Sequence, residues 1–169
     1  MQATSLTSFV ARPGAPRCPG RGLEAPQLIV GGWVRQPLRL DVPALQARGA
    51  EEVDFQVVCT FDGAHGDSLR LRAVPLAPLI DEAQPAFEHR TDFKRVAIVA
   101  ESSEGYRALF SWNELFNTPV GAGVMIAFAS PCAPSHEHRG AFTLISRQDL
   151  HTGPRYVRHL ALVEVVKLW

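Results

Sequence analysis

Short runs of alternating apolar and polar residues follow one another from Pro26 to the end of the chain. Leu38, Leu40 and Val42 alternate with polar residues, and a longer run has apolar residues at every second position from 53 to 57. This alternation places the apolar side chains on one face of an extended strand. The same pattern predicts further strands at 28–30, 96–100, 105–110, 124–129, 141–145 and 156–166. We therefore expect a fold made mostly of short strands.

The predicted helices are few and short. Residues 43–48 follow Asp41, a candidate N-cap, and begin with a proline that suits the first helical turn. Residues 75–83 carry apolar side chains at helical spacing, and Ser111 with Glu114 forms a capping-box motif. Many short strands with a few short helices indicate an α+β fold rather than a doubly wound sheet.

The length of 169 residues suits one domain with its own core. Residues 1–24 contain three prolines, three glycines and three arginines, without apolar periodicity. We expect residues 1–24 to form a flexible N-terminal tail and residues 25–169 to form the single domain.

The charge balance argues against a nucleic-acid partner. Seventeen Lys and Arg residues balance seventeen Asp and Glu residues, without a basic arm or acidic tail. Phosphate backbones are bound mainly through clustered positive charge. A membrane partner is not expected either, because prolines and glycines interrupt the longest uncharged stretch, residues 117–135.

The cysteine content favours a reducing compartment. Three cysteines are too few for a disulfide scaffold, and the N-terminus lacks a secretory pattern. We therefore predict a cytoplasmic location, or a periplasmic one if the true start of the chain lies upstream.

A further strand is predicted over residues 53–60, and Cys59 lies at its end, at the edge between strand and loop. A thiolate at such an edge could contact a metal ion or a substrate. The alternative is a small buried apolar residue, which is the usual role of a free cysteine.

A second candidate metal site lies in one loop, where Cys132, His136 and His138 are close in sequence. Thiolate and imidazole groups are ligands for zinc or copper. Two exposed histidines and an unrelated cysteine would give the same pattern.

Near the C-terminus, Arg155 and Arg158 follow a Gly-Pro pair. Two guanidinium groups three residues apart could clamp a phosphate. The alternative is an edge strand that keeps both arginines in solvent.

Four segments taken in order resemble a known family: residues 57–59, 71–80, 103–106 and 153–165. They are similar to the oxidoreductase molybdopterin-binding domain of the sulfite oxidase family, over about residues 27–168. Residues 105–116 are typical of its small stand-alone bacterial members.

The resemblance implies an α+β domain with several small mixed sheets and short helices around a pterin site. It implies that Cys59 binds molybdenum beside the pterin dithiolene, and that Arg155 and Arg158 help hold the cofactor phosphate. The implied activity is a two-electron oxidation or reduction of a small substrate, commonly with oxygen-atom transfer. The electron acceptor would be a separate molecule.

Two segments depart from the family pattern. Residues 60–62 replace a polar or basic segment, and residues 139–144 lack the family's proline and arginine. These departures favour an alternative function. In it the domain keeps the pterin fold without the molybdenum cofactor, and binds a small ligand or a protein partner without redox chemistry.

Overall fold

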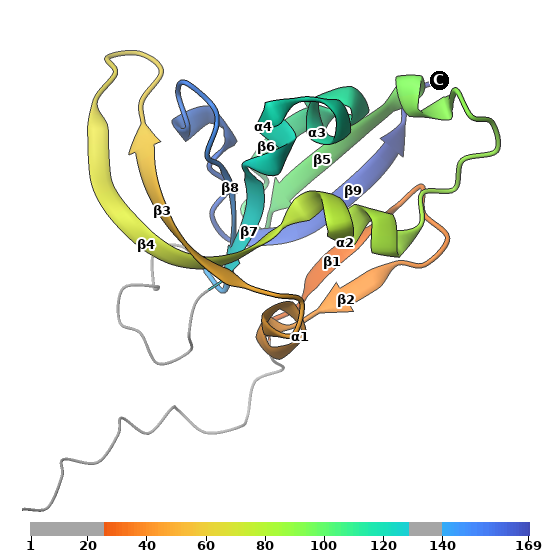
Figure 1. The fold of residues 1–169 in the computed structure, drawn as a ribbon, viewed down its shortest axis with the longest axis horizontal. Coiled ribbons are helices and arrows are strands. Elements are labelled where there is room, and N and C mark those ends of the chain that lie inside the picture. The colour runs from red at the N-terminus through yellow and green to blue at the C-terminus, as the bar shows by residue number, and fades with distance from the viewer. Residues whose placement is uncertain (1–25, 129–139) are drawn as a thin grey trace, which may run out of the picture.

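Two β-sheets form the framework of the chain in a computed structural model, which describes residues 26–128 and 140–169 (Figure 1). The five-stranded sheet has the order β2-β1-β9-β5-β6. Its strands are β1 (Leu28–Gly32), β2 (Leu38–Leu40), β5 (Val96–Ser102), β6 (Arg107–Ser111) and β9 (Leu160–Lys167). The sheet is mixed, because β1 runs parallel to β9 and the other neighbours are antiparallel.

The second sheet has four antiparallel strands in the order β3-β4-β7-β8. They are β3 (Glu51–Val58), β4 (His65–Pro75), β7 (Val124–Phe128) and β8 (Phe142–Ser146). The β3–β4 hairpin is long and curved, and its tip lies at the same end of the molecule as the loop that follows β8 (Figure 1).

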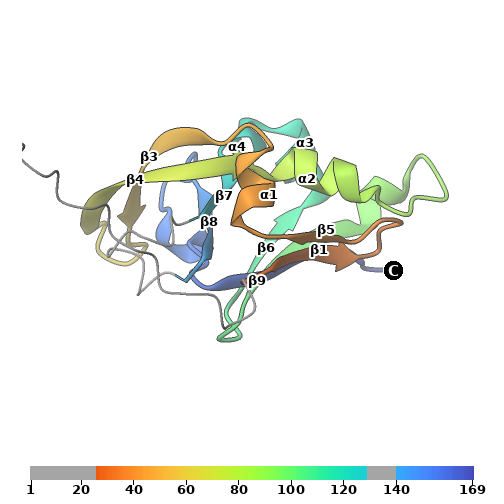
Figure 2. The same cartoon turned by 90° about the horizontal axis from the view of Figure 1, so that it is seen from below.

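The helices are short and lie over one face of the five-stranded sheet (Figure 2). They are α1 (Val42–Gln46), α2 (Leu76–Ala83), α3 (Trp112–Asn117) and α4 (Pro119–Ala122). Two 3-10 turns, η1 (Asp92–Arg95) and η3 (Gly153–Arg155), precede β5 and β9 in the chain. The α+β class predicted from the sequence, with small sheets and short helices, is confirmed. The predicted tail, residues 1–24, lies outside the described residues.

Both predicted helix caps are present. The Asp41 carboxylate accepts a hydrogen bond from the Ala44 N–H at 2.8 Å. The Ser111 hydroxyl accepts from the Glu114 N–H at 3.0 Å, and the Glu114 carboxylate accepts from the Ser111 N–H at 3.4 Å. This capping box begins α3 immediately after β6, so the strand and the helix meet at a fixed corner.

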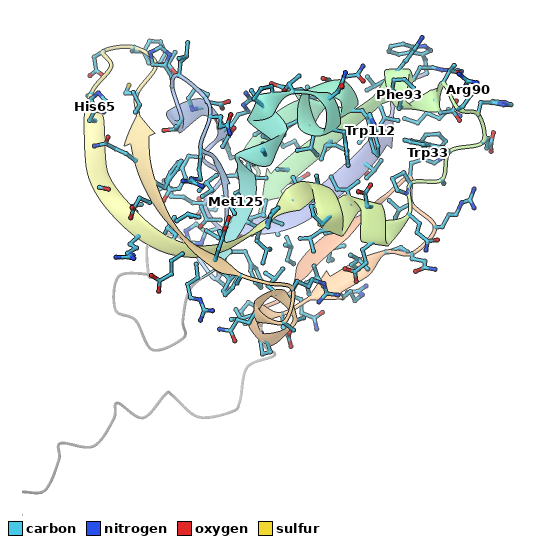
Figure 3. All side chains as sticks on the ribbon, in the orientation of Figure 1. Trp33, His65, Arg90, Phe93, Trp112 and Met125 are labelled. Atoms are coloured by element: carbon cyan, nitrogen blue, oxygen red, sulfur yellow. The ribbon has the colours of Figure 1, made fainter. Side chains whose placement is uncertain are left out.

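Strand β7 separates two packed clusters of side chains. Val124, Ile126 and Phe128 belong to the main core with the five-stranded sheet and α2. Met125 and Ala127 face a smaller cluster inside the curved sheet. Figure 3 labels Met125 in the middle of the molecule, with His65 at the hairpin end and Trp33 and Trp112 toward the opposite end. Burial on both faces explains why β7 is an uninterrupted apolar run.

Two predicted strand boundaries were wrong. The strand expected at 156–166 begins only at Leu160, because His159 adopts a φ of +52° that an extended strand does not allow. Val157 instead pairs with Leu144 of β8 in an isolated bridge. The strand predicted over residues 53–60 ends at Val58, so Cys59 lies outside it. Strand β4, from His65 to Pro75, was not predicted, because pairing with β3 extends it through polar residues.

Among residues 26–128 and 140–169, the helices are all too short and too polar to cross a membrane.

The close contact of α3 with α4 gives a stability prediction. A Cβ added to Gly121 would lie 1.7 Å from the Leu115 carbonyl oxygen. Because backbone must move to relieve this overlap, we expect Gly121→Ala to lower the free energy of unfolding by about 2–4 kcal/mol. Urea denaturation measures the change. Gly66→Ala is the matched control, since its Cβ would meet only an ordinary contact at 3.5 Å. Equal stability of the two variants would contradict the packing described.

Candidate functional site

Cys59 lies at the tip of the β3–β4 hairpin, one residue after β3 ends. Its backbone N–H donates to the Ala64 carbonyl at 3.0 Å, and its carbonyl accepts from the Gly63 N–H at 3.2 Å. Gly63 has a φ of +64°, which closes this turn without the strain that a side chain would bring. Cys59 is free and half-buried, and these two hydrogen bonds hold its backbone in the turn.

The Cys59 thiol donates a hydrogen bond to the Asp62 carboxylate. The Ala64 N–H donates to the same carboxylate at 2.9 Å. The Ala64 bond, followed by the thiol bond, holds the pKa of Asp62 below its usual value. The Asp62 carboxylate is therefore ionised at neutral pH and orients the thiol proton.

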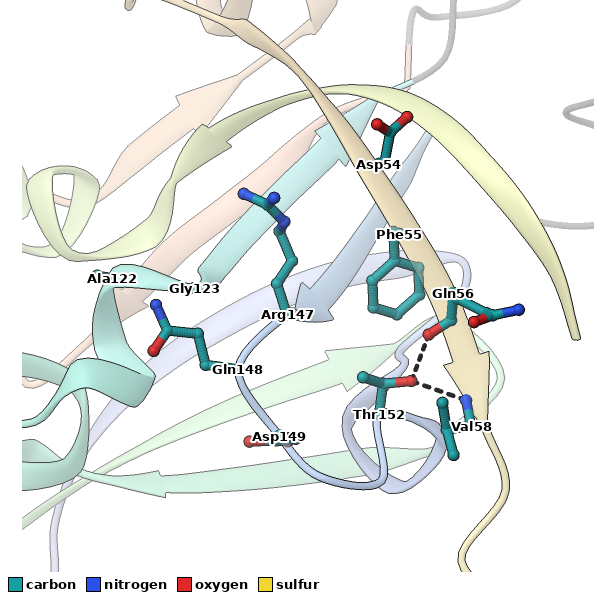
Figure 4. A pocket seen from close by; sticks show the side chains of 10 residues that line it. All are labelled: Asp54, Phe55, Gln56, Val58, Ala122, Gly123, Arg147, Gln148, Asp149 and Thr152. Atoms are coloured by element: carbon teal, nitrogen blue, oxygen red, sulfur yellow. Dashed lines mark hydrogen bonds between the residues drawn. The ribbon is translucent and has the colours of Figure 1, made fainter. Parts of the chain in front are cut away.

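Thr152 fastens the end of β3 to the loop after β8. Its hydroxyl donates to the Gln56 carbonyl at 2.6 Å and accepts from the Val58 N–H at 2.8 Å (Figure 4). The β3–β4 register shifts between Gln56 and Val58, where a bulge interrupts the ladder. One buried hydroxyl thus satisfies two backbone groups at the free edge of β3, and it brings η3 next to Cys59.

Arg155 is engaged by two acidic side chains. Its Nε and one Nη donate to the two Asp149 carboxylate oxygens at 2.7 and 2.5 Å. Its other Nη donates to Glu114, the capping-box residue of α3, at 2.6 Å. The guanidinium also lies 4.5 Å from the centre of the Phe110 ring. Arg155 therefore joins η3, the loop after β8 and the β6–α3 corner.

Burial lowers the pKa of the Arg155 guanidinium, but its hydrogen bonds to Asp149 and Glu114 outweigh this effect, so the pKa is raised. The Arg155 side chain is only 20% exposed. The contacts of Arg155 are thus those of a residue that stabilises the fold. Its binding to a cofactor phosphate stays a prediction. Arg158 is exposed, and within the described part of the chain its side chain makes no ion pair or hydrogen bond.

A cleft of about 370 Å³ lies between the free edge of β3 and the loop after β8. The β3 residues that line it extend to Val58, the residue before Cys59. Figure 4 shows the Phe55 ring and Arg147 on its two sides. The remaining lining residues are Asp54, Gln56, Ala122, Gly123, Gln148, Asp149 and Thr152.

The structure brings together only part of the set predicted from the sequence. Cys59 and the η3 segment with Arg155 lie at the same end of the molecule, joined through Thr152. The loop with Cys132, His136 and His138 lies outside the described residues. Within the described ranges, 26–128 and 140–169, no group of three or more His, Cys, Asp or Glu side chains is placed so that it could hold a metal ion.

Sequence reasoning missed Thr152 and Arg147. Thr152 carries no local motif, because its partners are backbone groups of a strand about ninety residues earlier in the chain. Arg147 follows β8 directly, where an isolated arginine is typical of a solvent-exposed strand end.

Replacing Thr152 tests the link between β3 and η3. Thr152→Val removes the hydroxyl and leaves the Val58 N–H without its partner, so we expect a loss of about 1–3 kcal/mol in the free energy of unfolding. We also expect Cys59 to react faster with a thiol reagent, in a background with Cys18 and Cys132 replaced by Ser. Thr152→Ser keeps the hydroxyl and serves as the control. Unchanged stability and reactivity in Thr152→Val would contradict this link.

Arg155→Ala would leave the Asp149 and Glu114 carboxylates without their partner. We expect the free energy of unfolding to fall by about 2–4 kcal/mol. Arg158→Ala, an exposed neighbour, should change it by less than about 0.5 kcal/mol. Thermal and urea unfolding of both variants measure the difference, and similar small effects in both would rule out a structural role for Arg155.

Comparison with known proteins identifies a relative by fold. No family model matches the chain, and no curated protein matches its sequence. Its structure is similar to that of the sulfane dehydrogenase SoxCD from Paracoccus pantotrophus, with a TM-score of 0.57 and 16% sequence identity. The match covers 84% of this chain and 38% of that chain. The two proteins therefore share a related fold over a little more than a third of the length of the sulfane dehydrogenase chain.

Proposed function

We propose that this chain is a molybdopterin-dependent oxidoreductase domain in which Cys59 binds the metal. The placement of Cys59 carries the proposal. It is a free, half-buried cysteine at the hairpin tip, and its sequence neighbour Val58 lines a cleft of about 370 Å³. The fold likeness to a dehydrogenase and the resemblance of residues 57–59 and 153–165 to the sulfite oxidase family support the same class.

The residues present fit a metal that takes one thiolate from the protein. Cys59 is not in a disulfide and is accessible, and its backbone is held by hydrogen bonds on both sides. Metal binding requires that the thiol lose its proton. The proton points at the exposed, ionised Asp62 carboxylate, which provides a route for it to solvent.

When bound, the cofactor would supply two-electron redox chemistry and oxygen-atom transfer. The chain itself would hold the metal through Cys59 Sγ and position a small substrate in the adjacent cleft. The exposed Arg158 is the group left to contact the cofactor phosphate, while Arg155 holds η3 in place through Asp149 and Glu114. Electrons would pass to or from a separate partner molecule.

A second candidate function is a pterin-fold domain that binds a small ligand without redox chemistry. The supporting observation is that Arg155 donates its hydrogen bonds to the carboxylates of Asp149 and Glu114. An arginine that binds the cofactor phosphate should have free donors. The departures at residues 60–62 and 139–144 favour the same candidate.

Metal content separates the two functions. Expressed in a host that makes the cofactor, the protein should contain near-stoichiometric molybdenum, measured by elemental mass spectrometry, with pterin detected by fluorescence after oxidation. Cys59→Ser should lose the metal and keep its fold, because a hydroxyl is a much poorer ligand for such a metal than a thiolate. Cys132→Ser is the matched control and should keep the metal. Well-folded wild-type protein without molybdenum or pterin would contradict the oxidoreductase function and support the second one.

A further inference from the structure

We propose that the cleft between β3 and the loop after β8 binds a small organic carboxylate that also carries an amide group, such as an N-acylated amino acid. Three observations carry this inference: the free backbone edge of β3, the guanidinium of Arg147, which is unpaired within the described residues, and the apolar side chains of Phe55 and Val58.

The free edge of β3 offers backbone hydrogen-bonding groups to the cleft. The Gln56 carbonyl and the Val58 N–H point to this edge, because both bind the Thr152 hydroxyl there. Alternate residues of an antiparallel strand direct their N–H and C=O groups to the same side. Asp54, two residues earlier, therefore turns its N–H and C=O toward the same edge and lines the cleft.

An amide group in a ligand could pair with Asp54 as a neighbouring strand would. Thr152 already occupies the edge at Gln56 and Val58, so the space for such pairing is short. The cleft is thus suited to one or two amide units rather than to a long peptide. Its volume of about 370 Å³ is at the small end of ligand pockets.

Arg147 supplies the positive charge on the opposite side of the cleft. Its backbone N–H donates to the Gly123 carbonyl at 2.9 Å, which fixes the residue at the end of β8. Among the described residues, the Arg147 side chain has no ion-pair or hydrogen-bond partner. The side chain is exposed and lines the cleft (Figure 4). A free guanidinium forks onto a carboxylate through two parallel N–H donors.

The acidic residues that line the cleft do not cancel this charge. The Asp149 side chain is 9% exposed, and both of its oxygens are bound by Arg155. Strand alternation directs the Asp54 side chain to the face of β3 opposite the Phe55 ring (Figure 4). A carboxylate in the cleft would therefore meet Arg147 as its main charged partner, with the Gln148 amide alongside.

Phe55 and Val58 give the cleft an apolar part. Phe55 is 3% exposed and packs against Tyr156, with 5.4 Å between the ring centres. Val58 is half-buried at the end nearest Cys59. These side chains suit a short aliphatic group, so the complementary ligand has a carboxylate, an amide and a small apolar body.

This inference deepens the proposed function by naming the substrate class next to Cys59, and it rests on that function for the role of the ligand as substrate. Binding itself requires none of the metal chemistry, because Cys59 does not line the cleft.

Calorimetric titration of the full chain tests the ligand class with three probes. N-acetyl-leucine should bind. N-acetyl-leucinamide lacks the charge and should bind at least about tenfold more weakly, because it cannot pair with Arg147. The compound 4-methylpentanoate lacks the amide and should bind several-fold more weakly. Absence of N-acetyl-leucine binding, or equal affinity for all three probes, would overturn the inference.

Two variants locate the site. Arg147→Gln should lower the affinity for N-acetyl-leucine to that of the amide probe, about tenfold or more. Arg39→Gln removes one exposed positive charge from β2, in the other sheet, and should bind like the wild type. Equal affinity of Arg147→Gln and the wild type would place the ligand elsewhere and overturn the assignment.

A titration of Cys59→Ser distinguishes this inference from the proposed function. N-acetyl-leucine binding should be retained in this variant whether or not molybdenum is lost. Retained binding together with wild-type molybdenum content would remove the metal role of Cys59 and leave the cleft assignment intact. Lost binding with a folded chain would contradict the cleft assignment.

Discussion

The Thr152 hydroxyl joins two parts of the fold that strand pairing alone would leave apart. Strand β3 is at the edge of the curved sheet and pairs only with β4. By bonding both Gln56 and Val58, Thr152 fastens the free edge of β3 to the loop after β8. A Cβ on the next residue, Gly153, would already lie 3.0 Å from the Val58 carbonyl, so the two backbones are in close contact. The position of Cys59 and the closed end of the cleft both depend on this contact.

Arg155 shows how the same fold limits what its site can bind. A guanidinium with free donors suits a phosphate, but here Asp149 and Glu114 occupy its Nε and both Nη groups. This arrangement holds η3 against the capped start of α3 and gives rigidity to the loop beside the cleft. Arg147, eight residues earlier, has donors that are free of partners among the described residues. The structure thus separates the arginine that holds the site from the arginine that faces a ligand.

Local signals in the sequence predicted the fold class and much of its detail. The Asp41 cap, the Ser111–Glu114 box and the alternation in β3 involve neighbouring residues, and all three are present in the structure. The late start of β9 was missed, because the alternating pattern of residues 156–166 does not signal the positive φ of His159. Thr152 and Arg147 could not be identified as site residues, since their roles depend on a strand far away in sequence. Cys59 was singled out by its place at a strand end, and its contact with Asp62 is added by the hairpin turn.

The central claim is that the Cys59 thiolate binds a molybdenum cofactor at the tip of the β3–β4 hairpin. The most direct measurement is the molybdenum X-ray absorption spectrum of the wild-type protein purified from a host that makes the cofactor, compared with that of any metal retained by Cys59→Ser. We expect sulfur coordination from the protein in addition to the dithiolene in the wild type, and loss of the protein sulfur in the variant. Identical molybdenum coordination in both proteins would contradict it.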